Sequence, residues 1–178
     1  MASKGGDRIM ELKNRSQYLD KLISVQDMEV IKVVTGIRRC GKSSLLKLMM
    51  AHLREQGVME EQILSMNFES MQFADMDSKS LYQYVTERES KGKRLYLFLD
   101  EVQKVRDWQD AVNSFRVDLD CDIYVTGSNA YLLSSELSTY LSGRYVEIKM
   151  LPLSFREQFR DRCIRLPMVN EARSLNLS

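Results

Sequence analysis

The run Gly36-Ile37-Arg38-Arg39-Cys40-Gly41-Lys42-Ser43 decides the fold of this chain, because it fits the pattern G-x-x-x-x-G-K-[ST]. The residues before it, Val30–Val34, form a short β-branched stretch that is typical of a strand. The residues after it, Lys42–Gln56, carry leucine and methionine on one helical face. Glycine at the tight positions lets backbone amides curl around an anion, and the amino end of the following helix attracts it. We therefore predict a strand, a phosphate-binding loop and a helix in succession.

Two side chains at the end of this loop have distinct predicted roles. Lys42 can reach the terminal phosphates of a nucleotide, and the hydroxyl group of Ser43 can bind Mg²⁺. Cys40 lies inside the loop, where the backbone rather than the side chain makes the contacts. We expect Cys40 to be a passive small residue; the alternative is a reactive thiol beside Lys42 and the helix end.

A second set of candidates follows the apolar run Leu95–Leu99, which is typical of a strand covered on both faces of a parallel sheet. Asp100 comes next, at the carboxyl end of that strand, where open α/β sheets bind ligands. Its carboxylate suits the metal side of a nucleotide site, and Glu101 can orient or deprotonate a water molecule. The alternative is a pair of solvated acids that simply end the strand.

Two further segments carry candidates for which a functional and a structural role are both open. Val125–Asn129 ends another apolar strand. Its Ser128 or Asn129 side chain has two possible roles: it positions a water molecule, or it caps the next helix. Arg144 follows Gly143 directly before the last predicted strand. It either neutralises charge on the γ-phosphate, in its own or a neighbouring subunit, or forms a surface salt bridge.

The rest of the chain alternates between strand and helix patterns. Further strands are predicted at Ile63–Glu69, Asp122–Thr126 and Tyr145–Met150. Further helices are predicted at Leu12–Val25, 78–90, Trp108–Val117, Tyr131–Tyr140 and Ser154–Arg162. Alternation of this kind requires right-handed crossovers between parallel strands, with helices on both faces of the sheet. The predicted fold class is α/β.

Four motifs occur in an order that resembles P-loop ATPases of the AAA+ type. They are VVTGIRRCGKSSLL at residues 33–46, LFLDEVQKVRDW at 97–108, VTGSN at 125–129 and the Gly143-Arg144 pair. More narrowly, residues 14–160 resemble a family of bacterial and archaeal predicted ATPases that carry this module at the amino terminus. The resemblance implies a three-layer α/β/α fold with a mainly parallel five-stranded sheet in the order 5-1-4-3-2.

The resemblance also implies site residues and the cofactors ATP and Mg²⁺. Asp100 becomes the metal-side acid, Glu101 the catalytic acid and Asn129 the γ-phosphate sensor. Arg144 becomes a candidate charge-neutralising arginine. The nucleotide-binding set comprises Gly36, Ile37, Arg38, Arg39, Cys40, Gly41, Lys42, Ser43 and Ser44.

The resemblance ends near residue 160. We therefore predict an ATPase domain over residues 1–160 and an atypical or truncated tail over 161–178, without the helical lid of the family. A lid commonly excludes water and closes over the base, so its loss disfavours efficient turnover. Gln103 and Trp108 match the family pattern as well, and packing is their expected role.

We predict that the chain binds ATP with Mg²⁺ and hydrolyses it, with Lys42, Glu101, Asn129 and Arg144 as catalytic candidates. The alternative is an ATP-binding switch or scaffold with negligible hydrolysis, with association to DNA left open. Glu101 favours the enzyme, and the missing lid favours the switch. A homo-oligomer is also left open, because Arg144 needs one if it acts on a neighbouring subunit.

The composition excludes several other classes of protein. A chain of 178 residues with 44% hydrophobic and 29% charged residues is neither disordered nor fibrous. Its formal net charge of +1 does not support a dedicated nucleic-acid binder. Three widely spaced cysteines indicate a reducing compartment, and a single histidine excludes a zinc site built on several histidines. We find no leader and no apolar run of about 18 residues, so we expect a cytoplasmic protein without a membrane span.

Overall fold

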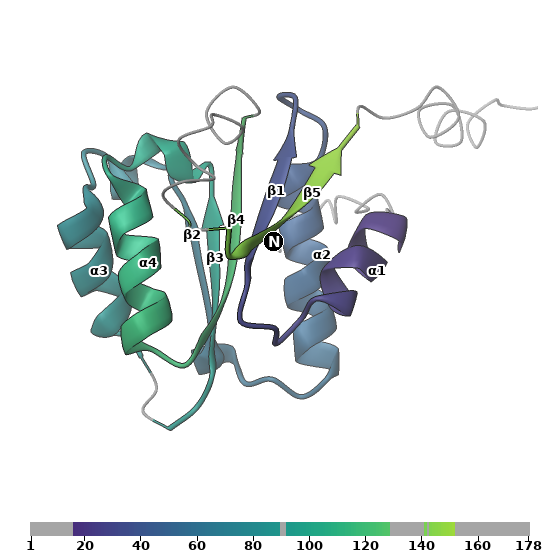
Figure 1. Ribbon diagram of the computed structural model, residues 1–178, viewed down its shortest axis with the longest axis horizontal. Helices are drawn as coiled ribbons and strands as arrows, with labels where there is room; N and C mark the ends of the chain where they lie inside the picture. The colour runs from purple at the N-terminus through teal and green to yellow at the C-terminus, as the bar shows by residue number, and fades with distance from the viewer. Residues whose placement is uncertain (1–15, 90–91, 129–140, 142, 152–178) are drawn as a thin grey trace, which may run out of the picture.

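The computed structural model describes residues 16–89, 92–128, 141 and 143–151. Within these residues the chain forms five strands and four α-helices (Figure 1). The strands are β1 (Ile31–Gly36), β2 (Ile63–Asn67), β3 (Leu95–Asp100), β4 (Cys121–Ser128) and β5 (Tyr145–Met150). The helices are α1 (Ser16–Ser24), α2 (Lys42–Glu55), α3 (Ser78–Thr86) and α4 (Trp108–Asp118), with one-turn 3₁₀ helices at Glu60–Gln62, Met71–Phe73 and Val102–Lys104. No described helix is both long and apolar enough to cross a lipid bilayer.

The five strands form one parallel sheet in the order β2-β3-β4-β1-β5. Read from β5 to β2, this order is 5-1-4-3-2, so the predicted strand order is confirmed. The register aligns the carboxyl ends of the strands: Gly36 lies opposite Ser128 and Met150, and Asn67 lies opposite Asp100. These ends therefore meet along one edge of the sheet, the upper edge in Figure 1.

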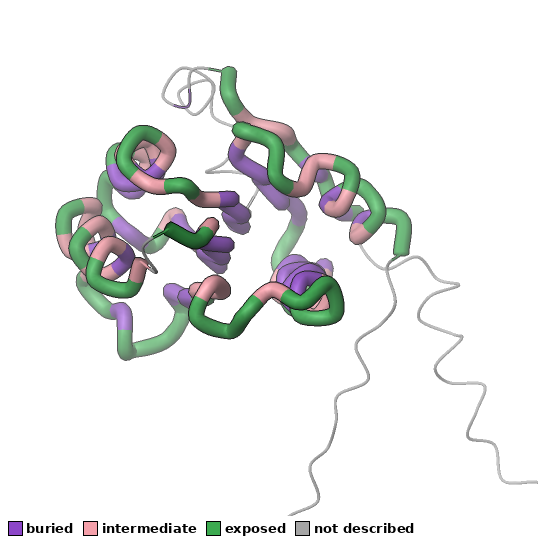
Figure 2. The backbone as a smooth tube through the Cα atoms, turned by 90° about the horizontal axis from the view of Figure 1, so that it is seen from below, coloured by how far each residue is buried: buried purple, intermediate pink, exposed green. Residues whose placement is uncertain are grey.

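Two layers of helices cover the sheet. Successive side chains of a strand point to opposite faces, and both faces carry apolar side chains that the helices bury. Val33 and Leu97 pack in the core beneath α3 and α4, whereas Val34 and Phe98 pack in the core beneath α1 and α2. Figure 2 shows the buried strands enclosed between the two layers. Each fully buried side chain of this size stabilises the fold by about 1.5–3 kcal/mol. Trp108 is buried in the first of these cores, which confirms its predicted packing role.

The sheet and its turns set several boundaries differently from the prediction. β1 and β4 extend to Gly36 and Ser128, because the two strands pair with each other up to that point. β2 ends at Asn67 rather than Glu69, because the side-chain oxygen of Asn67 accepts a hydrogen bond from the Glu69 amide at 2.8 Å and turns the chain. α3 ends at Thr86, before a charged segment that offers no apolar side chain to the core.

Some predictions fall on residues that the structure does not describe. α1 is described from Ser16 onward, so the first residues of the helix predicted from Leu12 lie outside. The helices predicted at Tyr131–Tyr140 and Ser154–Arg162 also lie outside the described residues, as does the tail over 161–178. The two helices and the tail remain predictions, as does the part of the first helix before Ser16.

Candidate nucleotide site

The loop between β1 and α2 requires glycine at two positions. A Cβ atom on Gly36 would lie 2.8 Å from the Met150 carbonyl oxygen and 2.5 Å from Cys40 Sγ. Gly41 has a φ angle of 95°, in the left-handed region, and directly precedes the first residue of α2. Arg39 has a φ angle of 64°, which is uncommon for a residue with a side chain. These conformations turn the chain so that α2 begins beside the end of β1.

The loop forms one wall of a hollow of about 360 Å³ at the carboxyl edge of the sheet. Its lining residues are Arg38, Arg39, Gly41, Lys42, Ser43, Ser44, Glu69 and Glu101. Most of the predicted binding set therefore gathers around one space, together with Glu101. Glu69, which follows β2, is an addition that the sequence analysis did not identify. Three members of the predicted set do not line the hollow: Gly36 ends β1, Ile37 is 53% exposed, and Cys40 is buried in the core beneath α1 and α2.

Lys42 is buried, and its ammonium group lies across the loop. Its Nζ donates a hydrogen bond to the Gly36 carbonyl oxygen at 3.4 Å and lies 3.3 Å from Glu101 Oε1. This ion pair joins the loop after β1 to the residue that follows β3. A buried ammonium group needs an anionic partner, and phosphate oxygens can take the place of the carboxylate.

One buried threonine on β4 holds both acids of the site. The Thr126 hydroxyl group donates a hydrogen bond to Asp100 Oδ1 at 2.5 Å and accepts one from the Glu101 amide at 2.9 Å. The hydroxyl group therefore satisfies a carboxylate that is almost fully buried. Glu101 has a φ angle of 57°, so the backbone turns sharply directly after β3. Thr126 has no role predicted from the sequence; its signal there is a threonine near the end of a buried strand.

The residues predicted to hold Mg²⁺ fit that ion by their chemistry. Mg²⁺ prefers oxygen ligands and keeps several water molecules when it binds beside substrate phosphates. Ser43 lies in the first turn of α2 and lines the hollow, and Asp100 ends β3 at the same edge of the sheet. Hydroxyl and carboxylate oxygens are the donors that this ion takes. Within the described part of the chain, no three His, Cys, Asp or Glu side chains cluster into a metal site of their own.

The end of β4 reaches the loop as well. Ser128 is the last residue of β4 and lies opposite Gly36 in the sheet register. Asn129, the predicted γ-phosphate sensor, lies outside the described residues. Whether it contacts a nucleotide or caps a helix therefore stays a prediction.

Arg144 lies at the amino edge of the sheet, where the strands begin, whereas the loop lies at the carboxyl edge, where they end. It directly precedes β5, whose first residue, Tyr145, lies opposite Ile31 at the start of β1. The Arg144 carbonyl oxygen accepts a hydrogen bond from the Ile31 amide at 3.0 Å, and the residue is exposed. The length of β1, roughly 17 Å, separates this edge from Gly36. The structure does not bring Arg144 to the site of its own subunit, because β5 runs parallel to β1; a role toward a neighbouring subunit stays a prediction.

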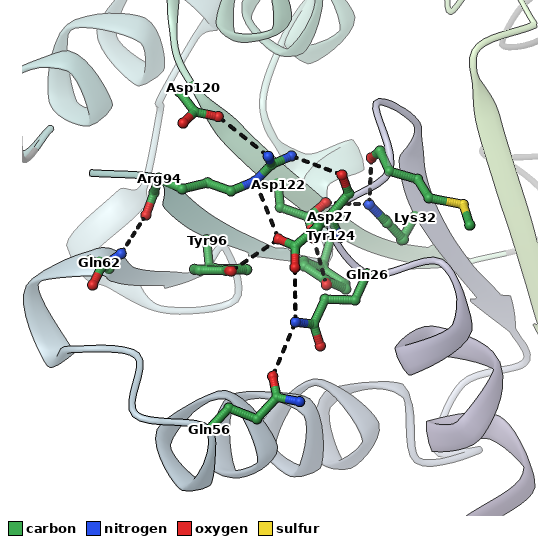
Figure 3. Close-up of polar contacts among 11 residues, drawn as sticks. Gln26, Asp27, Lys32, Gln56, Gln62, Arg94, Tyr96, Asp120, Asp122 and Tyr124 are labelled. Carbon is green, nitrogen blue, oxygen red and sulfur yellow. Dashed lines mark hydrogen bonds and ion pairs between the residues drawn. The ribbon is translucent and has the colours of Figure 1, made fainter. Parts of the chain in front are cut away.

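A second polar cluster lies toward that amino edge, around Lys32 and Asp122 (Figure 3). The two side chains are fully buried and form an ion pair, and Lys32 Nζ also donates a hydrogen bond to the Met28 carbonyl oxygen at 2.9 Å. Asp122 Oδ2 accepts hydrogen bonds from the Tyr124 hydroxyl group at 2.8 Å and the Asp27 amide at 3.0 Å. Burial lowers the pKa of Lys32, although the hydrogen bond and charge of Asp122 oppose that shift. These groups satisfy one another, which fits a structural role.

Comparison with known proteins places this site in context. The family model described as AAA domain matches residues 29–159 of this chain. An uncharacterized protein from Haemophilus influenzae is 47% identical over 146 residues, which cover 81% of this chain and 36% of that protein. An uncharacterized protein from Methanocaldococcus jannaschii is 29% identical over 150 residues, which cover 83% of this chain and 32% of that protein. The chain thus spans about a third of the length of these relatives.

Solved structures share the architecture at low identity. Saccharomyces cerevisiae RIF2 matches with a TM-score of 0.56 and 13% identity, covering 90% of this chain and 66% of that one. A DNA polymerase III gamma subunit-related protein from Thermotoga maritima matches with a TM-score of 0.55 and 12% identity, covering 81% of this chain and 48% of that one. Such likenesses show the fold alone. They agree with the α/β fold described above, whose five parallel strands lie in the region that the AAA domain model matches.

Proposed function

This chain belongs to the AAA domain family, and on that premise we propose that it is a Mg²⁺-dependent ATPase domain. Nucleotide binding of the ATPase type follows from the family. Hydrolysis is supported above all by one observation: Lys42 Nζ and Glu101 Oε1 lie 3.3 Å apart at the wall of one hollow. A phosphate-binding cation and a carboxylate able to act on water are thereby within reach of the same phosphate group.

Binding begins at the loop. Its backbone amides and the amino end of α2 attract the triphosphate, and the Lys42 ammonium group contacts the terminal phosphates. Arg38 and Arg39 add positive charge at the wall of the hollow. Ser43 and Asp100 hold Mg²⁺, which when bound supplies positive charge to the phosphate oxygens.

Glu101 acts as the base in this proposal. Its carboxylate takes a proton from a water molecule that lies in line with the bond to the γ-phosphate. Lys42 must first exchange the carboxylate for phosphate oxygens, because an ammonium group paired to Glu101 competes for the same lone pairs. Asn129 positions the water molecule, and Arg144 of a neighbouring subunit neutralises charge on the γ-phosphate. The last role requires a homo-oligomer.

A second candidate function is an ATP-binding switch or scaffold with negligible hydrolysis. This function results if Lys42 keeps its ion pair with Glu101 when the nucleotide is bound, because the paired carboxylate then does not take a proton from water. Work on DNA is a further prediction, to which the formal net charge of +1 adds no support.

Phosphate release and fluorescent-ATP binding, measured with Mg²⁺ on the full chain, separate these functions. Lys42→Ala is expected to weaken ATP binding by about 10- to 100-fold, because it removes charge-assisted contacts to phosphate. Glu101→Gln is expected to keep ATP binding and to slow turnover by about 100-fold or more. Lys47→Ala and Glu55→Gln are the matched controls, since both residues lie exposed on α2. Neither control should change binding or turnover.

Each outcome selects one function. Turnover in the wild type that Glu101→Gln abolishes supports the ATPase, whereas turnover that survives this change contradicts Glu101 as the base. Tight binding without turnover in the wild type supports the switch. Absence of ATP binding in a folded wild-type chain contradicts both functions.

A further inference from the structure

Glu101 is held from two sides. Lys42 Nζ lies 3.3 Å from its Oε1, and the side-chain amide of Gln103 donates a hydrogen bond from Nε2 to its Oε2 at 2.5 Å. All three residues line a second hollow, of about 290 Å³, at the carboxyl edge of the sheet. It adjoins the first hollow, with which it shares Arg38, Lys42, Glu69 and Glu101, and it also includes Lys104. The carboxylate therefore lies between a charged donor on the loop and a neutral donor on its own turn.

The turn that carries Gln103 is anchored in the core. Glu101 begins it with its left-handed backbone, and the Lys104 amide donates a hydrogen bond to the Glu101 carbonyl oxygen at 3.1 Å. Val102 and Val105 flank Gln103 and are buried in the core beneath α3 and α4. These anchors fix the backbone of Gln103, so its amide can return to Glu101 without ordering a flexible loop.

The amide of Gln103 is committed to Glu101. Within the described part of the chain, the Gln103 side chain makes this one hydrogen bond, and its Oε1 is buried without a partner. The orientation follows from the carboxylate, because a reversed amide would place two oxygen atoms face to face. An unpaired buried acceptor lowers the stability of the fold. The Gln103 side chain therefore costs stability at its oxygen atom, and its favourable polar contact is the hydrogen bond to Glu101.

We propose that Gln103 is a positioning residue for Glu101, an inference that rests on the proposed ATPase function. When Lys42 transfers to the phosphate groups, the Gln103 amide keeps its hydrogen bond and holds the carboxylate toward the hollow. A neutral donor suits this role, because it orients a carboxylate without pairing a full positive charge with it. Without Gln103, the released side chain of Glu101 gains rotamers that point away from the water molecule.

Gln103→Met tests the proposal, because methionine has a similar length and no hydrogen-bond donor. We expect kcat for phosphate release to fall by about tenfold or more, while KM and the Kd for fluorescent ATP change by less than about twofold. Gln72→Met is the control, since Gln72 is exposed on the neighbouring 3₁₀ helix. The same change is then made in Glu101→Gln, where we expect no further loss of kcat.

Two results would overturn the proposal. One is an equal loss of kcat from Gln103→Met in the wild type and in Glu101→Gln, which would mean that Gln103 does not act through Glu101. The other comes from the ¹⁵N–¹H resonances of the Gln103 side chain, identified by their loss in Gln103→Met. We expect Glu101→Ala to shift them and Glu55→Ala to leave them in place; unshifted resonances contradict the contact.

The two measurements also separate this inference from the proposed function. Absence of turnover in the wild type removes the ATPase. Because the positioning role requires catalysis, it falls with the ATPase, while the resonance shift still reports the contact itself. Turnover together with unshifted resonances removes Gln103 alone.

Discussion

The two edges of the sheet each hold a lysine paired with a carboxylate, and the pairs differ in what surrounds them. Lys32 and Asp122, toward the amino edge, have side chains with no exposed surface. Lys42 and Glu101, at the carboxyl edge, have side chains that are 4% and 18% exposed, beside a hollow of about 360 Å³. The same pair of charges is sealed at one edge and faces a ligand-sized space at the other.

The two pairs also differ in how fully their polar groups are hydrogen-bonded. Lys32 and Asp122 complete their hydrogen bonds with Met28, Asp27 and Tyr124, so removing either charge leaves the other buried without an opposite charge. Lys42 contacts its two partners at 3.3 and 3.4 Å, longer than typical hydrogen bonds. A ligand with stronger acceptors can therefore compete for the Lys42 ammonium group.

The largest effect is expected at the sealed pair. Lys32→Met leaves the Asp122 carboxylate buried without its cation, so we expect the free energy of unfolding to fall by about 3–5 kcal/mol. Lys32→Met combined with Asp122→Asn removes both charges and should recover at least half of that loss. Urea unfolding followed by circular dichroism measures both variants. A loss below about 1 kcal/mol in the single variant would erase the contrast between the two edges.

A smaller effect is expected at Thr126, which supports the open edge. Thr126→Val keeps the shape of the side chain but removes the hydrogen bonds to Asp100 and to the Glu101 amide. We expect the free energy of unfolding to fall by about 1–3 kcal/mol and kcat to fall by about tenfold. Thr86→Val is the control, because among the described residues the Thr86 hydroxyl group bonds only to carbonyl groups of its own helix, α3. Unchanged turnover in Thr126→Val would separate Thr126 from the site.

The smallest effect is expected at Tyr96, whose hydroxyl group donates a hydrogen bond to Asp27 Oδ1 at 3.0 Å. Tyr96→Phe should lower the free energy of unfolding by about 0.5–1.5 kcal/mol at neutral pH. Burial and the bond to Asp27 raise the pKa of Tyr96 from 10.0 to about 12. The unfolded chain therefore loses this proton first, and the stabilisation present below pH 10 is lost as the pH rises toward 12.

Unfolding midpoints measured between pH 8 and pH 12 test this alkaline effect. We expect the wild type to lose stability over the upper part of that range and Tyr96→Phe to lose less. Equal losses of stability in the two proteins would show that ionisation of Tyr96 does not contribute to the pH dependence of unfolding.

The sequence by itself determined those parts of the site whose conformation depends on residues adjacent in the chain. The glycines of the loop, the start of α2 and the acids after β3 are contiguous with the patterns that predict them. Their backbone and burial requirements are local, so the positions of Gly36, Lys42 and Asp100 at the loop and the strand end could be predicted, while their roles toward phosphate and Mg²⁺ stay predictions. The strand order came from the resemblance, and the structure confirms it.

Only the tertiary structure decided which distant residues meet. Alternation along a strand assigns a side chain to a face of the sheet, but it does not name the partner on the next strand. Lys32 meets Asp122 across 90 residues of chain, and Thr126 meets Asp100 across 26. The direction of β5 likewise carries Arg144 away from the loop. Register and strand direction are set by the packing of the whole sheet, and they place one ion pair in the interior and the other beside a hollow.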